Sequence, residues 1–386
     1  MPRRAALWND PRLRAMLFQA LVIAGVVAVG AYLVRNTLVN MQRQGIATGF
    51  GYLGREASFE IGESFIRYSP ADSYGRALLV GLLNTLLVAA LGVVLSTVLG
   101  MAIGIARLAR NWLVRKLALV YVEALRNLPL LLQLIVWWDI LRVSAPPPRQ
   151  AWEPLPGVYV SVRGIVFPVP AYAPVYRDMA IAFVAAVVAG WAVLCWARRR
   201  RAATGRPFPG RAVAAILALG APLAVFLAGG APFAWNWPVM HAFNFSGGAS
   251  LSPEFAALLF GLTAYTAAFI AEIVRSGIEG VSRGQTEAAL ALGLRRVQVL
   301  RLVVLPQALR IIVPPLLSEY LALTKNSSLA IAIGYPELMS ITNTTLNQTG
   351  QAVEAIALMM AIYLAVSLAI SAAVNWFNRR IALVER

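Results

Sequence analysis

Side chains that commonly carry catalysis or bind metals are scarce in this chain. Its 386 residues include one histidine, His241, and one cysteine, Cys195. Multi-histidine metal sites, thiolate clusters and disulfide frameworks are therefore excluded. The only lysines, Lys116 and Lys325, do not follow a glycine, so neither completes the Gly-Lys-Ser/Thr ending of a phosphate-binding loop. We expect no catalytic residue, no metal and no ATP site in this chain.

Six ionisable residues lie inside apolar stretches, and these are Glu123, Arg126, Asp139, Glu272, Glu319 and Lys325. A charge in hydrocarbon is costly, so such residues are either paired or functional. Residues three apart on a helix share a face and can form an ion pair. Sequence spacing therefore predicts three structural pairs, which are Glu123 with Arg126, Asp139 with Arg142, and Glu272 with Arg275.

The apolar stretch 308–333, which contains Glu319 and Lys325, has features of a solute path. Pro314 and Pro315 lie upstream in the same stretch and are expected to break the helix, which would free backbone groups to line a cavity. Glu319 and Asn326 are seven residues apart and share a helical face. Packing between subunits is the alternative role for this face. The residues that we assign to a possible translocation path are Glu319, Lys325, Asn326 and Asp139.

The elements that hold these residues are membrane spans. Hydrophobic residues make up 59% of the chain and charged residues only 13%, with a mean hydropathy of +0.69. Soluble domains carry roughly 25% charged residues. The first stretch is long for a signal peptide and lacks a clear cleavage site, so we favour an uncleaved helix. Eight stretches are long enough to span a bilayer, and they are 15–34, 77–106, 117–141, 178–197, 212–230, 254–274, 308–333 and 353–377.

The net charge of +17 indicates topology. With the N-terminus inside, 23 of the 34 basic residues fall on the cytoplasmic side, 9 fall outside and 2 lie at membrane depth. This asymmetry predicts that both termini are cytoplasmic. The run Arg198–Arg201 is typical of a stop-transfer anchor. It lacks the interleaved aromatic residues of a nucleic-acid site, so we expect no nucleic-acid partner.

Four regions follow from this topology: 1–76, a helix with an extracytoplasmic segment; 77–142, the first part of a core; 143–251, an inserted pair of helices; and 252–386, the second part of the core. Prolines exclude a helix from 142–177. The segment 231–253 is a second outer loop, with Trp235 and Trp237 as interfacial anchors. Glu56, Glu60 and Glu63 have helical spacing, which predicts a short surface helix there.

The cytoplasmic segment 275–307 looks ordered. Gln285–Leu292 consists of good helix formers, and Gly293 lies where a helix C-terminal cap belongs. A second helix is expected over Arg295–Leu305, ending at Pro306. The first helix should expose small and apolar residues, which require a partner groove. These residues are Ala288, Ala289, Leu290 and Leu292.

This segment resembles the "EAA" signature of ABC-importer permeases. The signature reads E-A-A, three residues, G, nine residues, I, one residue, L-P. Here Glu287-Ala288-Ala289 is followed at those spacings by Gly293, Val303 and Leu305-Pro306. Val303 in place of isoleucine is the only departure. The resemblance implies that Glu287, Ala288, Ala289, Gly293, Leu305 and Pro306 couple the chain to an ATPase.

Three further stretches are similar to permeases for polar amino acids. They are Gly81–Leu86, the segment 121–133 with its Y-x-E-x-x-R-x-x-P-L-L-x-Q pattern, and the segment 323–329 with L-x-K-x-S-S-L. In the second stretch we expect Glu123, Arg126 and Pro129 to be structural or interface residues. The resemblance covers about 77–142 and 252–377. The extra helices are similar to the enlarged, broad-specificity general L-amino-acid permeases.

The resemblance implies an all-α membrane protein with the type I ABC importer permease fold. It also implies a second homologous permease subunit, two copies of a P-loop ATPase that bind ATP, and a periplasmic amino-acid-binding protein. The location would be the bacterial inner membrane. A permease for another small polar solute is the main alternative. A secondary transporter would show inverted repeats, which we do not find, and would leave the ordered 283–306 segment unexplained.

Overall fold

The computed structural model describes residues 11–43, 45, 48–231, 233–241 and 243–381. The chain forms two compact units, one of Met1–Trp138 with Ala257–Arg386 and the other of Asp139–Ala256. Within the described residues, seven helices are long and apolar enough to cross a membrane, and a bent helix pair supplies an eighth if it counts as one span. This count confirms the helical membrane architecture and agrees with the eight predicted stretches.

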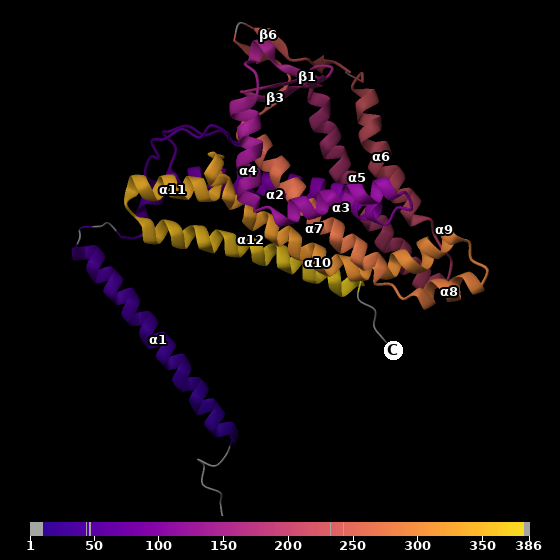
Figure 1. Ribbon diagram of the computed structural model, residues 1–386, viewed down its shortest axis with the longest axis horizontal. Helices are drawn as coiled ribbons and strands as arrows, with labels where there is room; N and C mark the ends of the chain where they lie inside the picture. Colours follow the sequence, from indigo (N-terminus) through magenta and orange to yellow (C-terminus); the bar gives the residue numbers. More distant parts are fainter. Residues whose placement is uncertain (1–10, 44, 46–47, 232, 242, 382–386) are drawn as a thin grey trace, which may run out of the picture. The chain divides into compact units, whose positions relative to one another are not determined.

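The first unit is built from long helices (Figure 1). Four precede the second unit in sequence: α1 (Pro11–Arg43), α2 (Tyr74–Arg107), α3 (Trp112–Asn127) and α4 (Leu130–Asp139). The rest are α7 (Pro253–Glu279), α8 (Arg283–Ala291), α9 (Arg296–Val299), α10 (Leu305–Asn326), α11 (Leu338–Thr349) and α12 (Ala352–Ile381).

Small residues on α2 let it approach α7 closely. A Cβ added to Gly100 would lie 2.6 Å from Ile270 Cβ, and one added to Gly104 would lie 2.8 Å from Val274 Cβ. Neither position has room for a larger residue. Glycines four residues apart form the close helix contact that substitutes for hydrophobic driving force in lipid.

The predicted span 117–141 is broken into two helices, α3 and α4, which meet at an angle of 104°. Pro129 causes the break because it has no N–H to donate to the carbonyl of Leu125. Gln133 supplies the missing donor. Its Nε2 donates to the Leu125 carbonyl at 2.9 Å and to the Leu128 carbonyl at 3.0 Å. The Leu125 and Leu128 carbonyls at the bend therefore receive hydrogen bonds from a nearby side chain of the same segment.

The surface helix predicted around Glu56, Glu60 and Glu63 is wrong. Apart from a short 3-10 turn at Phe50–Gly54, this segment is irregular. Its backbone pairs with residues further along instead, since the Ala57 N–H donates to the Asp72 carbonyl at 2.8 Å. Tyr52 and Ala57 are buried in a cluster with Tyr74, Leu78, Leu338 and Ile341. Tertiary packing thus overrides the helical spacing of the glutamates.

The expected break at Pro314 and Pro315 is also absent, because α10 continues through both residues. Each proline still removes one backbone donor, which leaves the carbonyls of Arg310 and Ile311 without the usual intrahelical partner. Tyr320 Oη and Thr97 Oγ1, 2.7 Å apart, join α10 to α2 further along.

The second unit contains a helical hairpin and short strands. Its helices are α5 (Pro174–Thr204) and α6 (Gly210–Ala228) (Figure 1). The segments predicted to be loops contain no long helix, as expected, but they add strands that an all-α prediction missed. These are β1 (Trp152–Leu155), β2 (Val158–Ser161), β3 (Gly164–Phe167), β4 (Val169–Pro170), β5 (Trp235–Asn236), β6 (Val239–His241), β7 (Asn244–Ser246) and β8 (Ala249–Leu251).

These strands join the two predicted loops of the second unit. The order β1-β2-β3-β8 forms an antiparallel sheet in which Val166 of β3 pairs with Ser250 of β8. The pairs β4-β5 and β6-β7 form two smaller ribbons. Pairing between segments more than 80 residues apart has no local sequence signal, which explains why it was not predicted.

Glu337 is a fully buried carboxylate in the first unit, outside the candidate spans. It caps α11 by accepting hydrogen bonds from the N–H groups of Met339 and Ser340, each at 2.8 Å. Tyr363 Oη of α12 donates to the same carboxylate at 2.9 Å. Burial raises the pKa of Glu337 to about 7, although these hydrogen bonds act in the opposite direction.

This geometry predicts a pH-dependent contribution to stability. Because the folded pKa of Glu337 exceeds the unfolded value, its contribution is complete below about pH 4.5 and is lost as the pH rises through about 7. Glu337→Gln stays neutral and keeps an acceptor for the cap. The melting temperature of the wild type should therefore fall relative to that of Glu337→Gln between pH 5 and pH 8, measured by thermal unfolding in detergent.

The exposed Glu60→Gln variant is the control, and its difference from the wild type should change less over this range. A difference between wild type and Glu337→Gln that stays constant from pH 5 to pH 8 would contradict the prediction.

Candidate functional site

The ordered segment after α7 forms the predicted helix with its glycine cap. The helix α8 ends before Gly293, whose φ of +79° lies in the left-handed region that favours glycine. The Gly293 N–H donates to the Leu290 carbonyl at 2.9 Å, and the Leu294 N–H donates to the Ala289 carbonyl at 3.3 Å. This pair of hydrogen bonds is the Schellman motif. The direction in which the chain leaves α8 is therefore set by one residue.

The end of α8 presents apolar side chains outward. Leu292 is 82% exposed, Leu290 is also exposed, and Val297 of the neighbouring α9 is exposed as well. Ala289, predicted to be exposed with them, is instead buried. The reason is that α8 packs against the segment Leu300–Val304 and therefore has one face turned inward. The polar Glu287 and the small Ala288 remain on the exposed part of α8.

The second predicted helix does not end at Pro306. The helix α9 continues through a π-helical turn, Leu300–Val304, directly into α10. Pro306 lies in the first turn of α10, which is the position where a helix tolerates a residue without an N–H. Leu305 begins that helix and is exposed. The helix α9, the π turn and α10 form one candidate span, Arg296–Ile333. The π turn that packs against α8 is therefore part of a candidate membrane helix.

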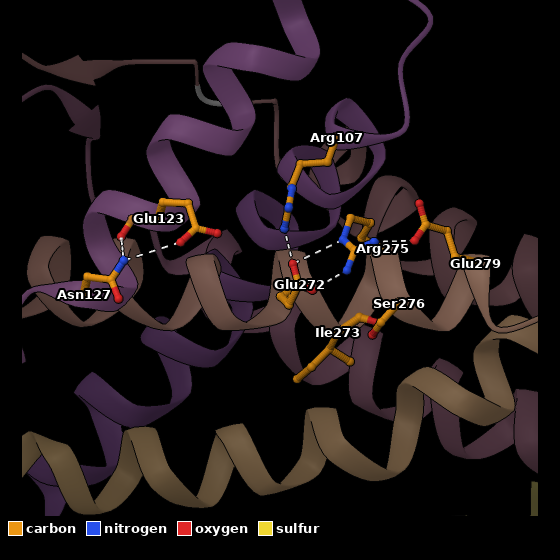
Figure 2. A network of polar contacts seen from close by, with 8 residues as sticks. All are labelled: Arg107, Glu123, Asn127, Glu272, Ile273, Arg275, Ser276 and Glu279. Atoms are coloured by element: carbon orange, nitrogen blue, oxygen red, sulfur yellow. Dashed lines mark hydrogen bonds and ion pairs between the residues drawn. The ribbon is translucent and has the colours of Figure 1, made fainter.

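An ion-pair network joins α2 to α7 (Figure 2). Glu272 binds Arg275 one turn later, with Oε1 2.5 Å from Nη2, which confirms this predicted pair. Arg107 of α2 contacts Glu272 from the other side, and Arg275 also contacts Glu279. The Arg107 side chain is only 11% exposed. The network therefore adds a partly buried charge contact at the α2–α7 interface, close to the glycine contact of Gly104.

The other two predicted pairs are wrong. Glu123 accepts from Asn127 Nδ2 at 3.4 Å (Figure 2), and that nitrogen also donates to the Glu123 carbonyl at 2.8 Å. The Arg126 guanidinium instead lies over the Phe269 ring of α7, 5.1 Å from its centroid. A cation over an aromatic face is an attractive contact. Glu123 and Arg126 therefore each interact with a different side chain and not with each other.

A similar exchange of partners occurs at Asp139 in the second unit. Asp139 accepts from Ser144 Oγ at 3.2 Å. Arg142 pairs with Glu254, with Nε 3.7 Å from Oε1, and donates to the Val162 carbonyl at 3.2 Å. Both partners of Arg142 are distant in sequence, so spacing could not indicate them.

The polar residues of α10 that we predicted to line a path differ in how far they are exposed. Glu319 is half-buried in the middle part of the helix. Asn326 is half-buried at the end of the helix, and Lys325 beside it is exposed.

Several motif residues have structural roles that the sequence did not reveal. Asn84 Nδ2 donates to the carbonyls of Glu63 and Pro336, each at 2.9 Å, and thereby joins α2 to the turn before α11. Tyr121 Oη donates to the Ala264 carbonyl of α7 at 2.8 Å. Within the described part of the chain, no three His, Cys, Asp or Glu residues are grouped so as to hold a metal ion.

The ion-pair network gives a stability prediction. Glu272→Gln leaves Arg107 and Arg275 facing each other without their shared counter-charge, which should cost about 2–4 kcal/mol. Glu279→Gln is the matched control because Glu279 is 53% exposed and contacts the same arginine. It should cost less than about 1 kcal/mol. Thermal unfolding of the two variants in detergent tests this order, and an equal loss in both would contradict it.

Comparison with known proteins places these features in a family. Residues 92–383 match the family described as binding-protein-dependent transport system inner membrane component. The chain is 48% identical to the general L-amino acid transport system permease protein AapQ of Rhizobium johnstonii, over 99% of this chain and 96% of the relative.

Two further relatives also match over nearly their whole length. The putative amino-acid ABC transporter permease protein YhdX of Escherichia coli is 46% identical over 98% of this chain and 96% of its own length. The glutamate/glutamine/aspartate/asparagine transport system permease protein BztB of Rhodobacter capsulatus is 42% identical over 100% and 97%. The chain therefore belongs to the family of binding-protein-dependent transport system inner membrane components.

Proposed function

We propose that this chain is the permease subunit of an ATP-driven importer of L-amino acids. The observation that carries the proposal is the α8 helix with its Gly293 cap and exposed Leu292, which leads within a few residues into a candidate span. The three relatives, whose names refer to amino-acid transport, match nearly the whole chain and support the substrate class.

The energy comes from partner chains in this proposal. Two copies of a P-loop ATPase bind ATP, and one of them receives the end of α8 in a groove. An apolar helix end that is exposed to water is stabilised when a groove buries it. Movement of that groove then displaces α8, and the π turn between α9 and α10 passes the displacement to the span. Glu287, Ala288, Ala289, Gly293, Leu305 and Pro306 form this coupling element.

The remaining partners complete the path. A periplasmic binding protein delivers the amino acid, and a second, homologous permease subunit forms the other wall of the path in the bacterial inner membrane. Both termini of this chain lie in the cytoplasm, as the basic residues predict. A zwitterionic amino acid suits a path that has an acidic and a basic group. The path candidates Glu319, Lys325, Asn326 and Asp139 include both kinds of group.

Gly293→Asp should uncouple ATP hydrolysis from uptake. The variant adds a charged Cβ substituent at a position with φ of +79° at the end of the coupling helix. Gly350→Asp is the matched control, because Gly350 also follows a helix, has φ of +70° and has no atom within 4 Å of an added Cβ. We expect uptake of labelled amino acid in Gly293→Asp to fall at least about tenfold while membrane insertion is retained. Normal uptake by Gly293→Asp would overturn the proposal.

A second variant separates docking from backbone strain. Leu292→Asn removes an exposed apolar side chain without changing a buried contact, so the fold should be unaffected. Co-purification with the ATPase should decrease in this variant. Leu155→Asn, which alters an equally apolar exposed residue in β1, should leave co-purification unchanged.

A further inference from the structure

The turn between α5 and α6 carries an unbalanced concentration of positive charge. Six arginines lie between residues 198 and 211, and the sequence from 179 to 253 contains no aspartate or glutamate. Among the residues that the structure describes, none of these six arginines forms an ion pair. A stop-transfer role explains positive charge at this position, but it does not require that the arginines surround a cavity.

Three of these arginines line a cavity of about 410 Å³ between the two helices. Arg198 and Arg201 are three residues apart on α5, so they share a face. Arg211 reaches the cavity from the start of α6. The rest of the wall includes the apolar side chains of Leu194, Ala197 and Phe208. The cavity therefore combines a cationic rim with an apolar wall.

Packing of the hairpin holds this cavity in place. The two helices approach closely at Gly210, where an added Cβ would lie 2.9 Å from Ala197 Cβ. Trp196 and Phe208 pack edge to face with their centroids 5.1 Å apart. The Arg200 guanidinium lies 5.1 Å from the Trp196 centroid, so this arginine is held by the aromatic side of the turn. Arg200 is not among the arginines that line the cavity.

The helices on either side of the turn, α5 and α6, expose apolar side chains as membrane-spanning helices do. Both α5 and α6 are candidate spans, and large apolar residues along them are exposed, among them Trp191 on α5 and Ile216 and Leu219 on α6. The cavity lies where these apolar helices end, and the ends of membrane-spanning helices are expected at the level of the lipid headgroups. Basic residues next to a span and basic pockets between spans bind anionic headgroups.

We propose that this cavity binds the phosphate headgroup of an anionic glycerophospholipid. Arginine presents a planar fork of donors that matches two phosphate oxygens, and three arginines converge on the cavity. Leu194, Ala197 and Phe208 would contact the glycerol and the first methylene groups of the acyl chains. An acidic protein surface would satisfy the arginines but would not need the apolar wall, so the observations favour lipid. The inference requires only that α5 and α6 span the membrane and does not depend on amino-acid transport.

The test uses the full-length chain purified in detergent, with phosphatidylglycerol as the probe and phosphatidylcholine as the neutral reference. Native mass spectrometry measures how many lipid molecules remain bound and at what concentration. Arg201→Gln/Arg211→Gln removes two cavity arginines. Arg199→Gln/Arg206→Gln removes the same charge from the same turn but outside the cavity. Arg201→Lys/Arg211→Lys keeps the charge and serves if the glutamine variant fails to fold.

The wild type should retain phosphatidylglycerol in preference to phosphatidylcholine. The glutamine cavity variant should bind phosphatidylglycerol at least about tenfold more weakly, because it loses two of the three arginines that line the cavity. The control variant should stay within about threefold of the wild type. The lysine variant should fall between the wild type and the glutamine variant, because it loses the fork geometry only.

Three outcomes would overturn the proposal. Equal losses in the cavity and control variants would show general attraction to the basic turn in place of a site. Displacement of bound lipid by millimolar inorganic phosphate would indicate a free-phosphate site. Unchanged lipid binding in the cavity variants, together with reduced co-purification of the ATPase, would assign these arginines to a protein partner.

Discussion

Backbone hydrogen bonding in hydrocarbon is the constraint on which this structure depends. A peptide group without a partner costs several kcal/mol where no water is available. The chain meets this demand with long helices, and it supplies a specific substitute where a helix must bend. Gln133 takes the place of the N–H that Pro129 lacks, so that α3 and α4 can turn by 104° without leaving the Leu125 and Leu128 carbonyls unpaired.

The second requirement is close contact between helices, since lipid provides little hydrophobic drive for their association. The glycines of α2 bring its backbone against α7, and the Arg107–Glu272–Arg275 network joins the same two helices by charge. Tyr121 and Tyr320 add hydrogen bonds from α3 to α7 and from α10 to α2. These contacts make the first unit a connected scaffold, and the α8–α9 segment is attached to it through α7 and α10. A force applied to α8 therefore acts on packed helices.

The second unit follows different rules. Its helical hairpin packs through small residues, whereas its polar segments form antiparallel strands that satisfy their backbone groups through each other. Its charges are separated along the chain, with no acidic residue between 179 and 253 and six arginines at the turn between α5 and α6. Three of these arginines line the cavity at that turn.

Local features were predictable from the sequence because they depend on neighbouring residues. The number of apolar stretches, the absence of long helices from the proline-rich loops, the Gly293 cap and the Glu272–Arg275 pair all follow from composition or from spacings of a few residues. Tertiary structure alone decided the features that join distant positions. Arg142 forms its ion pair with Glu254 and not with Asp139, and Arg126 lies over the ring of Phe269 and does not pair with Glu123. The segment 56–63 packs against Tyr74 and Leu338 and does not form a helix. The physical reason is that a side chain pairs with the best partner that packing brings near, and sequence spacing shows only the partners on its own helix.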